Sequence, residues 1–235
     1  MVTGDPPDFD ELYASSFTGV AVQLYAYFGD LAEAQDVTQE AFCRAWQRWA
    51  TVSRYDDPVA WVRKVAWRLA ISRWRRIKTA VLHVRRSSEV HAPALDGVRV
   101  DVVRALAQLP ADQRRAIVLH HLAGLSTSEI AADAGVADGT VSSWLTHGQA
   151  ALSSQLALAG PITGERLGEI LGDLRGTVAA QVRPPGAGTV RRTVQRRRTT
   201  QRIAAGAAAV AILAGAAGVL ALHRGRPDPV TSLPA

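Results

Sequence analysis

The spacing of helix-start and helix-end residues in one stretch constrains the fold of this chain more than any other feature. A helical pattern over residues 110–123 stops at Gly124, and glycine is favoured just beyond a helix end. The next motif, Ser126-Thr-Ser-Glu129, is a capping box that starts a second helix ending at Gly135. A third helix follows from Asp138. Helices joined by turns this short favour a helix-turn-helix.

The apolar side of this motif predicts which residues of its last helix face outward. Ala131 is small enough for close helix crossing, while Val136 and Val141 are expected to bury the last helix against the one before it. No lysine or arginine occurs in residues 138–158, and basic contacts to phosphates dominate DNA affinity, so we expect weak DNA binding here. The opposite side would lie in a major groove, and it carries Thr140, Ser142, Ser143, Thr146 and His147.

Residues 9–78 form an earlier block that also reads as helical. Between positions 34 and 49, apolar residues recur at steps of three and four, which predicts the buried face of a long helix. The opposite face carries Asp36, Gln39 and Glu40. On the residues alone, this face is either a solvated acidic surface or a binding surface.

A cationic run interleaved with tryptophans follows in the same block. Asp57 is the expected N-cap of the helix that carries the run, and Pro58 suits its first turn. Cations that follow phosphates and aromatic rings that stack on bases are what single-stranded DNA binding requires. The alternative is that the tryptophans are core residues and the arginines a solubilising face. The residues that we predict to bind DNA are Trp61, Arg63, Lys64, Trp67, Arg68, Arg75 and Arg76.

The overall basicity of the chain does not itself argue for DNA binding. Residues 1–160 carry 16 Lys and Arg against 17 Asp and Glu, whereas residues 161–235 carry 11 against 4. The DNA argument therefore rests on local clusters. The one cysteine, Cys43, excludes a disulfide framework, and no residue pattern predicts a catalytic, cofactor or metal site.

The C-terminal third contains an uncharged run, residues 203–222, whose length suits one transmembrane helix. Ten of its twenty residues are alanine and three are glycine, so the run is only weakly apolar. Six arginines lie between positions 191 and 202 and two follow the run, so the positive-inside rule places the N-terminal body in the cytoplasm. The alternatives are an alanine-rich soluble helix or a segment that inserts only with a partner.

Taken together, the two blocks resemble the extracytoplasmic-function (ECF) sigma factors of bacterial RNA polymerase. In the first block, Asp36-Val-Thr-Gln-Glu-Ala-Phe-Cys-Arg-Ala-Trp46 is similar to the family segment that grips the clamp coiled coil of core polymerase. This similarity implies that Asp36, Gln39 and Glu40 bind polymerase. Residues 61–76 resemble the helix that melts and reads the minus-ten element, and residues 125–145 resemble the reader of the minus-thirty-five element.

The resemblance implies an all-α fold with two small helical DNA-binding modules joined by a flexible linker. The uncharged run 203–222 adds the expected single C-terminal transmembrane helix. The expected parts are sigma domain two (9–78), a linker (79–99), sigma domain four (100–157), a spacer with a basic juxtamembrane segment (158–202), the span (203–222) and a short tail (223–235). Within the spacer, the sequence predicts a short helix at about 164–181. The implied partners are core polymerase, promoter DNA and an anti-sigma factor, with the membrane as a further predicted contact.

Two other classes of protein stay open on sequence grounds. A membrane-anchored helix-turn-helix regulator would bind DNA without polymerase, but it gives no reason for the 36–46 segment. A structural or signalling membrane protein could use the helix-turn-helix for protein contacts, which the absence of lysine and arginine from residues 138–158 leaves open. Nothing resembles a nucleophile elbow, a phosphate loop or a zinc motif, so the sequence argues against an enzyme.

Overall fold

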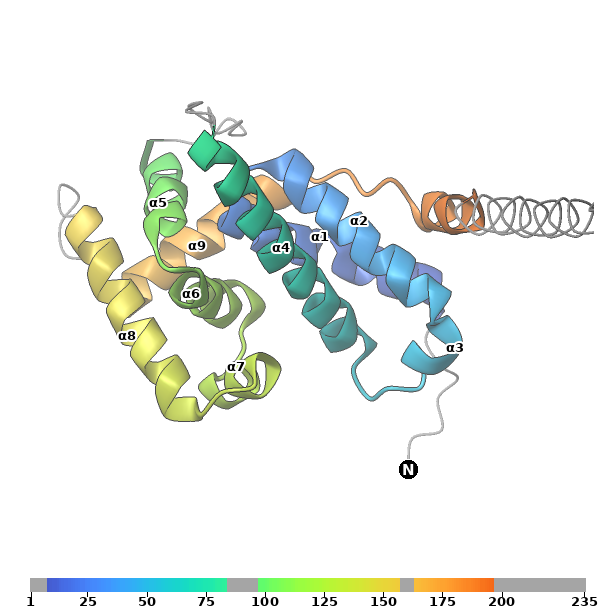
Figure 1. The fold of residues 1–235 in the computed structure, drawn as a ribbon, viewed down its shortest axis with the longest axis horizontal. Helices are drawn as coiled ribbons and strands as arrows, with labels where there is room; N and C mark the ends of the chain where they lie inside the picture. Colours follow the sequence, from blue (N-terminus) through green and yellow to red (C-terminus); the bar gives the residue numbers. More distant parts are fainter. Residues whose placement is uncertain (1–7, 84–96, 157–162, 197–235) are drawn as a thin grey trace, which may run out of the picture. The chain divides into compact units, whose positions relative to one another are not determined.

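The structure is a computed structural model that describes residues 8–83, 97–156 and 163–196 (Figure 1). In these residues all regular structure is helical, as expected. The chain divides into two units, Met1–Val190 and Arg191–Ala235, and residues 191–196 of the second unit are helical. The labelled helices of the first unit are α1 (Phe9–Phe28), α2 (Leu31–Gln47), α3 (Trp49–Val52), α4 (Pro58–His83), α5 (Gly97–Gln108), α6 (Ala111–Ala123), α7 (Thr127–Ala134), α8 (Asp138–Gln155) and α9 (Gly164–Ala179).

Helices α1–α4 form a first module, which we call module one. Asp30 Oδ1 accepts the Glu33 N–H at 3.1 Å and starts α2, and Asp57 Oδ1 accepts the Ala60 N–H at 2.8 Å at the start of α4. The predicted cap at Asp57 is therefore confirmed. The rings of α1, α2 and α3 meet in an aromatic cluster that holds the three helices together. Its members are Phe9, Tyr13, Phe17, Phe42, Trp46 and Trp49.

Helices α5–α8 form module two, which contains the predicted helix-turn-helix. Ser126 Oγ accepts the Glu129 N–H at 3.2 Å, and Glu129 Oε2 accepts the Ser126 N–H at 2.8 Å, so the capping box is present. Gly135 ends α7 at φ 73°, in the left-handed region that favours glycine. Val141 is fully buried as predicted, but Val136 is 36% exposed, so α8 is anchored without it.

The two modules pack against each other through a buried arginine of α6. Arg114 is 2% exposed, and its Nη1 donates to the Tyr27 carbonyl of α1 at 2.9 Å. Its Nη2 donates to the carbonyls of Ala107 and Leu109 at 2.6 and 3.1 Å. The guanidinium also lies 4.9 Å from the Tyr27 ring centroid and 4.4 Å from that of Trp74. Arg114 therefore joins module two to both α1 and α4 of module one.

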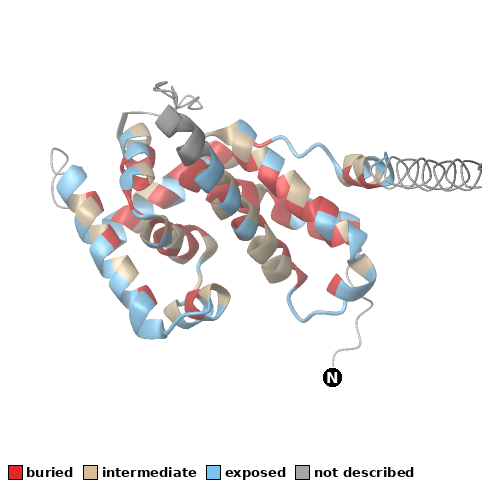
Figure 2. Cartoon of the chain, viewed as in Figure 1, coloured by how far each residue is buried: buried red, intermediate tan, exposed pale blue. Residues whose placement is uncertain are grey.

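The two ends of the expected linker are helical, and the short helix expected near residues 164–181 of the spacer is confirmed as α9. The backbone of α4 continues to His83 and α5 begins at Gly97, so only 84–96 of the expected linker lies outside the described residues. In the expected spacer, α9 packs on α6, α5 and α1, with its apolar side buried (Figure 2). No helix in the described ranges is long and apolar enough to cross a membrane, and the expected span 203–222 lies outside those ranges.

Candidate nucleic-acid and protein interfaces

The acidic face of α2 is partly open and partly engaged. Asp36 is exposed, while Glu40 is half-buried and pairs with Arg44 at 3.2 Å, one helical turn away. Gln39 is also half-buried, and its Oε1 accepts a hydrogen bond from the Tyr13 hydroxyl at 3.0 Å. The three residues predicted to bind a partner therefore lie along one helix, and Asp36 is the most accessible of them.

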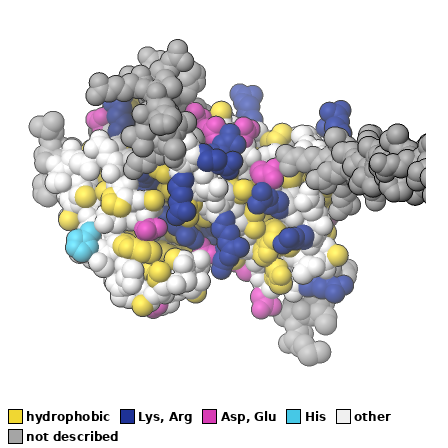
Figure 3. Space-filling view, in the orientation of Figure 1, with side chains coloured by type: hydrophobic (Ala, Val, Ile, Leu, Met, Phe, Trp, Pro, Cys, Tyr) yellow, Lys and Arg dark blue, Asp and Glu magenta, His cyan; other side chains and the backbone are white. Residues whose placement is uncertain are grey.

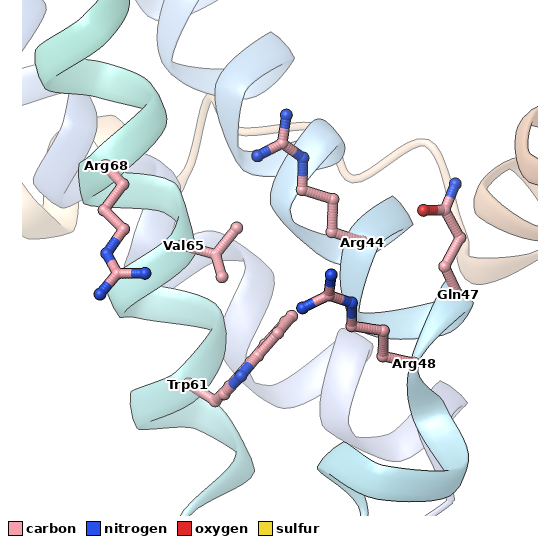
Figure 4. A pocket seen from close by; sticks show the side chains of 6 residues that line it. All are labelled: Arg44, Gln47, Arg48, Trp61, Val65 and Arg68. Carbon is pink, nitrogen blue, oxygen red and sulfur yellow. The ribbon is translucent and has the colours of Figure 1, made fainter.

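A hollow of about 280 Å³ lies between α2 and α4 beside this face (Figure 4). Trp61 and Arg68, both predicted to bind DNA, line it from α4. Arg44 and Arg48 line it from the α2 side, and the Trp61 ring points toward Arg48 in the close-up. Aromatic and cationic groups around one hollow suit an unstacked base and its phosphate. The lining residues are Arg44, Gln47, Arg48, Trp61, Val65 and Arg68.

Arg44 and Arg48 were not among the predicted DNA residues. They are far from the cationic run in sequence, and only the packing of α2 on α4 brings the two sets together. Their spacing of four residues, which places both on one side of a helix, is the signal that the sequence offers.

The remaining predicted residues of α4 divide between two environments. Lys64 Nζ lies 3.7 Å from Asp133 Oδ1 of α7, so it is turned toward module two. Arg63 lies close enough to α7 to contribute to lowering the pKa of Glu129, after the larger effects of the Ser126 hydrogen bonds. Arg75 and Arg76 are exposed. In the space-filling view, Lys and Arg side chains gather in a band down the middle of this face (Figure 3).

Trp67 is fully buried in this structure. Its ring centroid lies 5.1 Å from that of Tyr27, and the Arg115 guanidinium of α6 lies 5.8 Å from the Trp67 ring. The expectation that Trp67 is exposed for base stacking is therefore wrong for this conformation, because α1 and α6 cover the ring. Within the described part of the chain, its indole Nε1 has no acceptor. A role for Trp67 in DNA binding stays a prediction that requires the modules to separate.

The outward side of α8 lies as the sequence predicts. Thr140, Ser142, Ser143, Thr146 and His147 are all exposed. The Thr146 hydroxyl donates to the Ser142 carbonyl at 3.0 Å, and Ser143 Oγ lies 3.1 Å from His147 Nδ1. These are short intrahelical contacts, so the five side chains remain accessible to a groove.

These features, two helical modules with a cationic aromatic helix and a helix-turn-helix, define a sigma-70-type initiation factor. Residues 13–79 match the family described as Sigma-70 region 2, and residues 99–152 match Sigma-70, region 4. The two matches cover module one from its fifth residue and most of module two.

Relatives and a solved structure narrow this class. The chain is 38% identical over 135 residues to the ECF RNA polymerase sigma factor SigL of Mycobacterium tuberculosis, covering 53% of this chain and 75% of SigL. It is 30% identical over 170 residues to SigE of Mycolicibacterium smegmatis, covering 66% of this chain and 65% of that protein. The sigma factor RpoE of Bartonella quintana, solved with the anti-sigma factor NepR, has the same fold, with a TM-score of 0.55, 24% identity, and 64% and 98% coverage of the two chains. The chain belongs to the ECF family of RNA polymerase sigma factors, which are initiation factors and not enzymes.

Proposed function

We propose that this sigma factor docks on the clamp coiled coil of core polymerase through Asp36, Gln39 and Glu40 of α2. The observation that carries this assignment is the exposed carboxylate of Asp36 beside the arginine-lined hollow on the same pair of helices. An exposed acidic edge suits a basic partner surface, and its position brings the hollow next to the DNA that polymerase holds.

The hollow between α2 and α4 is the proposed site for an unstacked base of the minus-ten element. Trp61 offers the stacking face, and Arg44, Arg48 and Arg68 offer cations for the flanking phosphates. The exposed Arg75 and Arg76 extend the cationic track along α4.

The outer side of α8 is the proposed reader of the minus-thirty-five element. Its five exposed residues can hydrogen-bond to base edges, but the helix supplies no lysine or arginine for phosphates. We therefore expect module two to add specificity and little affinity, with a shallow dependence of its own DNA binding on salt.

Run-off transcription with the full chain and a bacterial core polymerase tests this function. We expect a promoter-dependent transcript that Asp36→Arg abolishes by placing a cation against a basic surface. Glu165→Arg, the same type of change at an exposed position of α9, should leave the transcript intact. DNA binding without any polymerase binding or transcript would instead indicate an anchored regulator that works alone.

An anti-sigma factor is a further proposed partner, supported by the RpoE structure, which was solved with NepR. Co-expression of the chain with candidate anti-sigma proteins tests this. We expect one of them to co-purify with the chain and to suppress run-off transcription, and the partner proposal fails if none does.

Residues 203–222 are proposed to tether the chain to the cytoplasmic membrane with the N-terminus inside. The uncharged length and the arginines before the run support this placement. A fluorescent protein fused at the N-terminus should mark the cell periphery, and deletion of 203–222 should release it. Diffuse fluorescence from the intact fusion would contradict the tether.

A further inference from the structure

The segment after module two returns to module one. The apolar side of α9, formed by Leu167, Leu171, Leu174 and Val178, is 0% exposed. Since α9 packs on α6 and α5 of module two and also on α1 of module one, it bridges the two modules. We call residues 164–190 the C-terminal arm. The arm lies beyond the region 4 match, which ends at residue 152.

After α9, the arm runs beside α2 (Figure 1). The Arg183 N–H donates to Gln35 Oε1 of α2 at 3.1 Å. The backbone of Gly186 hydrogen-bonds to the Tyr13 hydroxyl, which in turn donates to Gln39 Oε1 at 3.0 Å. Gln39, one of the residues assigned to polymerase binding, is therefore linked to the arm through one side chain.

Two valines anchor this part of the arm. Val182 is 7% exposed and Val190 is 0% exposed, on either side of the exposed Pro184 and Pro185. The segment is thus held by apolar contacts at its two ends and by single hydrogen bonds between them.

The polar fit between the arm and α2 is incomplete. Gln39 Nε2 is buried without an acceptor among the described residues. A buried donor without a partner is unfavourable, so a partner surface that supplies an acceptor to Gln39 would bind α2 in preference to the arm. Asp36, one turn away toward the N-terminus of α2, is exposed and remains open to a first contact.

We propose that the C-terminal arm is an internal competitor of core polymerase, which covers the Gln35–Gln39 edge of α2 and keeps module two closed on module one. This inference rests on the proposed polymerase-binding role of α2. Polymerase first meets Asp36, then displaces the arm from Gln39. Loss of the arm removes one of the contacts that hold the modules together and favours exposure of Trp67 and Lys64.

Weakening the arm should therefore strengthen polymerase binding. Val182→Asp in the full chain places a charge in a buried position of the arm, outside the modules themselves. We expect the apparent Kd of this variant for bacterial core polymerase to fall by about tenfold. This is the change that follows if about one tenth of the unmodified chain is in the binding-competent form and most of the variant is. The matched control, Arg175→Asp, introduces the same residue on the exposed side of α9 and should bind like the unmodified chain.

Hydrogen exchange on the unmodified chain provides a second measurement that needs no variant. Adding core polymerase should speed exchange of backbone amides in residues 164–190. Unchanged exchange there, or a Val182→Asp chain with unaltered affinity, overturns the competitor role.

Asp36→Arg separates the two proposals. If it weakens polymerase binding while Val182→Asp has no effect, α2 is the polymerase surface and the arm does not compete for it. If Asp36→Arg has no effect on polymerase binding, the proposed function of α2 fails, and the arm proposal fails with it.

Discussion

Replacing Arg114 with methionine should destabilise the chain markedly, because this one side chain holds three backbone carbonyls. Each of the Tyr27, Ala107 and Leu109 oxygens accepts a charge-assisted hydrogen bond that is worth about 1.5–3 kcal/mol, and the guanidinium also contacts two aromatic rings. Burial of the charge, which also lowers the pKa of Arg114, offsets part of this gain. We therefore expect a net loss of about 2–4 kcal/mol in the free energy of unfolding.

Urea unfolding of the full chain, followed by tryptophan fluorescence, measures this loss. Trp74 lies against the guanidinium, so it is one of the six tryptophans whose emission follows unfolding of this region. Methionine keeps most of the volume of the side chain, which limits any cavity effect. The control is Arg104→Met, which removes an exposed arginine that pairs with the exposed Asp101 and should cost under about 0.5 kcal/mol. If the Arg114 variant unfolds at the same urea concentration as that control, the module contact contributes nothing and the reasoning is wrong.

Three further changes have defined outcomes. Gly135→Ala should cost about 1 kcal/mol, read from the urea midpoint, because φ is 73° while no neighbouring atom obstructs a Cβ; an unchanged midpoint would contradict this. Burial and the neighbouring His120 lower the pKa of His121 from 6.5 to about 4, so as pH falls the unfolded chain binds this proton before the folded chain does. The free energy of unfolding should therefore decrease as pH drops from about 6.5 toward about 4, and His121→Gln should make this decrease smaller. Trp61→Ala should remove a stacking contact worth roughly 1–3 kcal/mol and so reduce the amount of open promoter complex several-fold or more. Trp61→Phe should retain most of the complex, and equal amounts of open complex for the two variants would exclude stacking.

Local signals explain why the helix-turn-helix could be predicted from sequence. The Ser126 and Glu129 caps and the Gly135 turn act within a few residues, and their geometry does not depend on the rest of the chain. The same is true of the Asp57 cap at the start of α4. The outward side of α8 followed from these boundaries, because the helical period relates each exposed position to the buried Val141.

Contacts between modules could not be predicted in this way. Trp67 and Trp74 are interleaved with the arginines of α4 in the same way as Trp61, so the sequence does not distinguish a buried ring from an exposed one. Trp67 is buried because α6 packs over it. Arg114 belongs to a helix with other charged residues, so no local pattern marks it as buried. The helix near residues 164–181 could be predicted from its own sequence, but nothing local showed that its apolar side packs on α6, α5 and α1.

The leucine-rich side of α9 also affects how long an open molecule stays dispersed. Burying the four side chains stabilises the closed form by roughly 6–12 kcal/mol before the entropy of docking is subtracted. A chain whose α9 has separated from the modules therefore exposes a continuous apolar strip along about three turns of helix, and such strips drive self-association. Under the proposal that polymerase displaces the arm, each molecule that leaves polymerase would have to return this strip to its own modules or self-associate. The rate of that reclosure would then set how much of the sigma factor pool is available for another round of initiation.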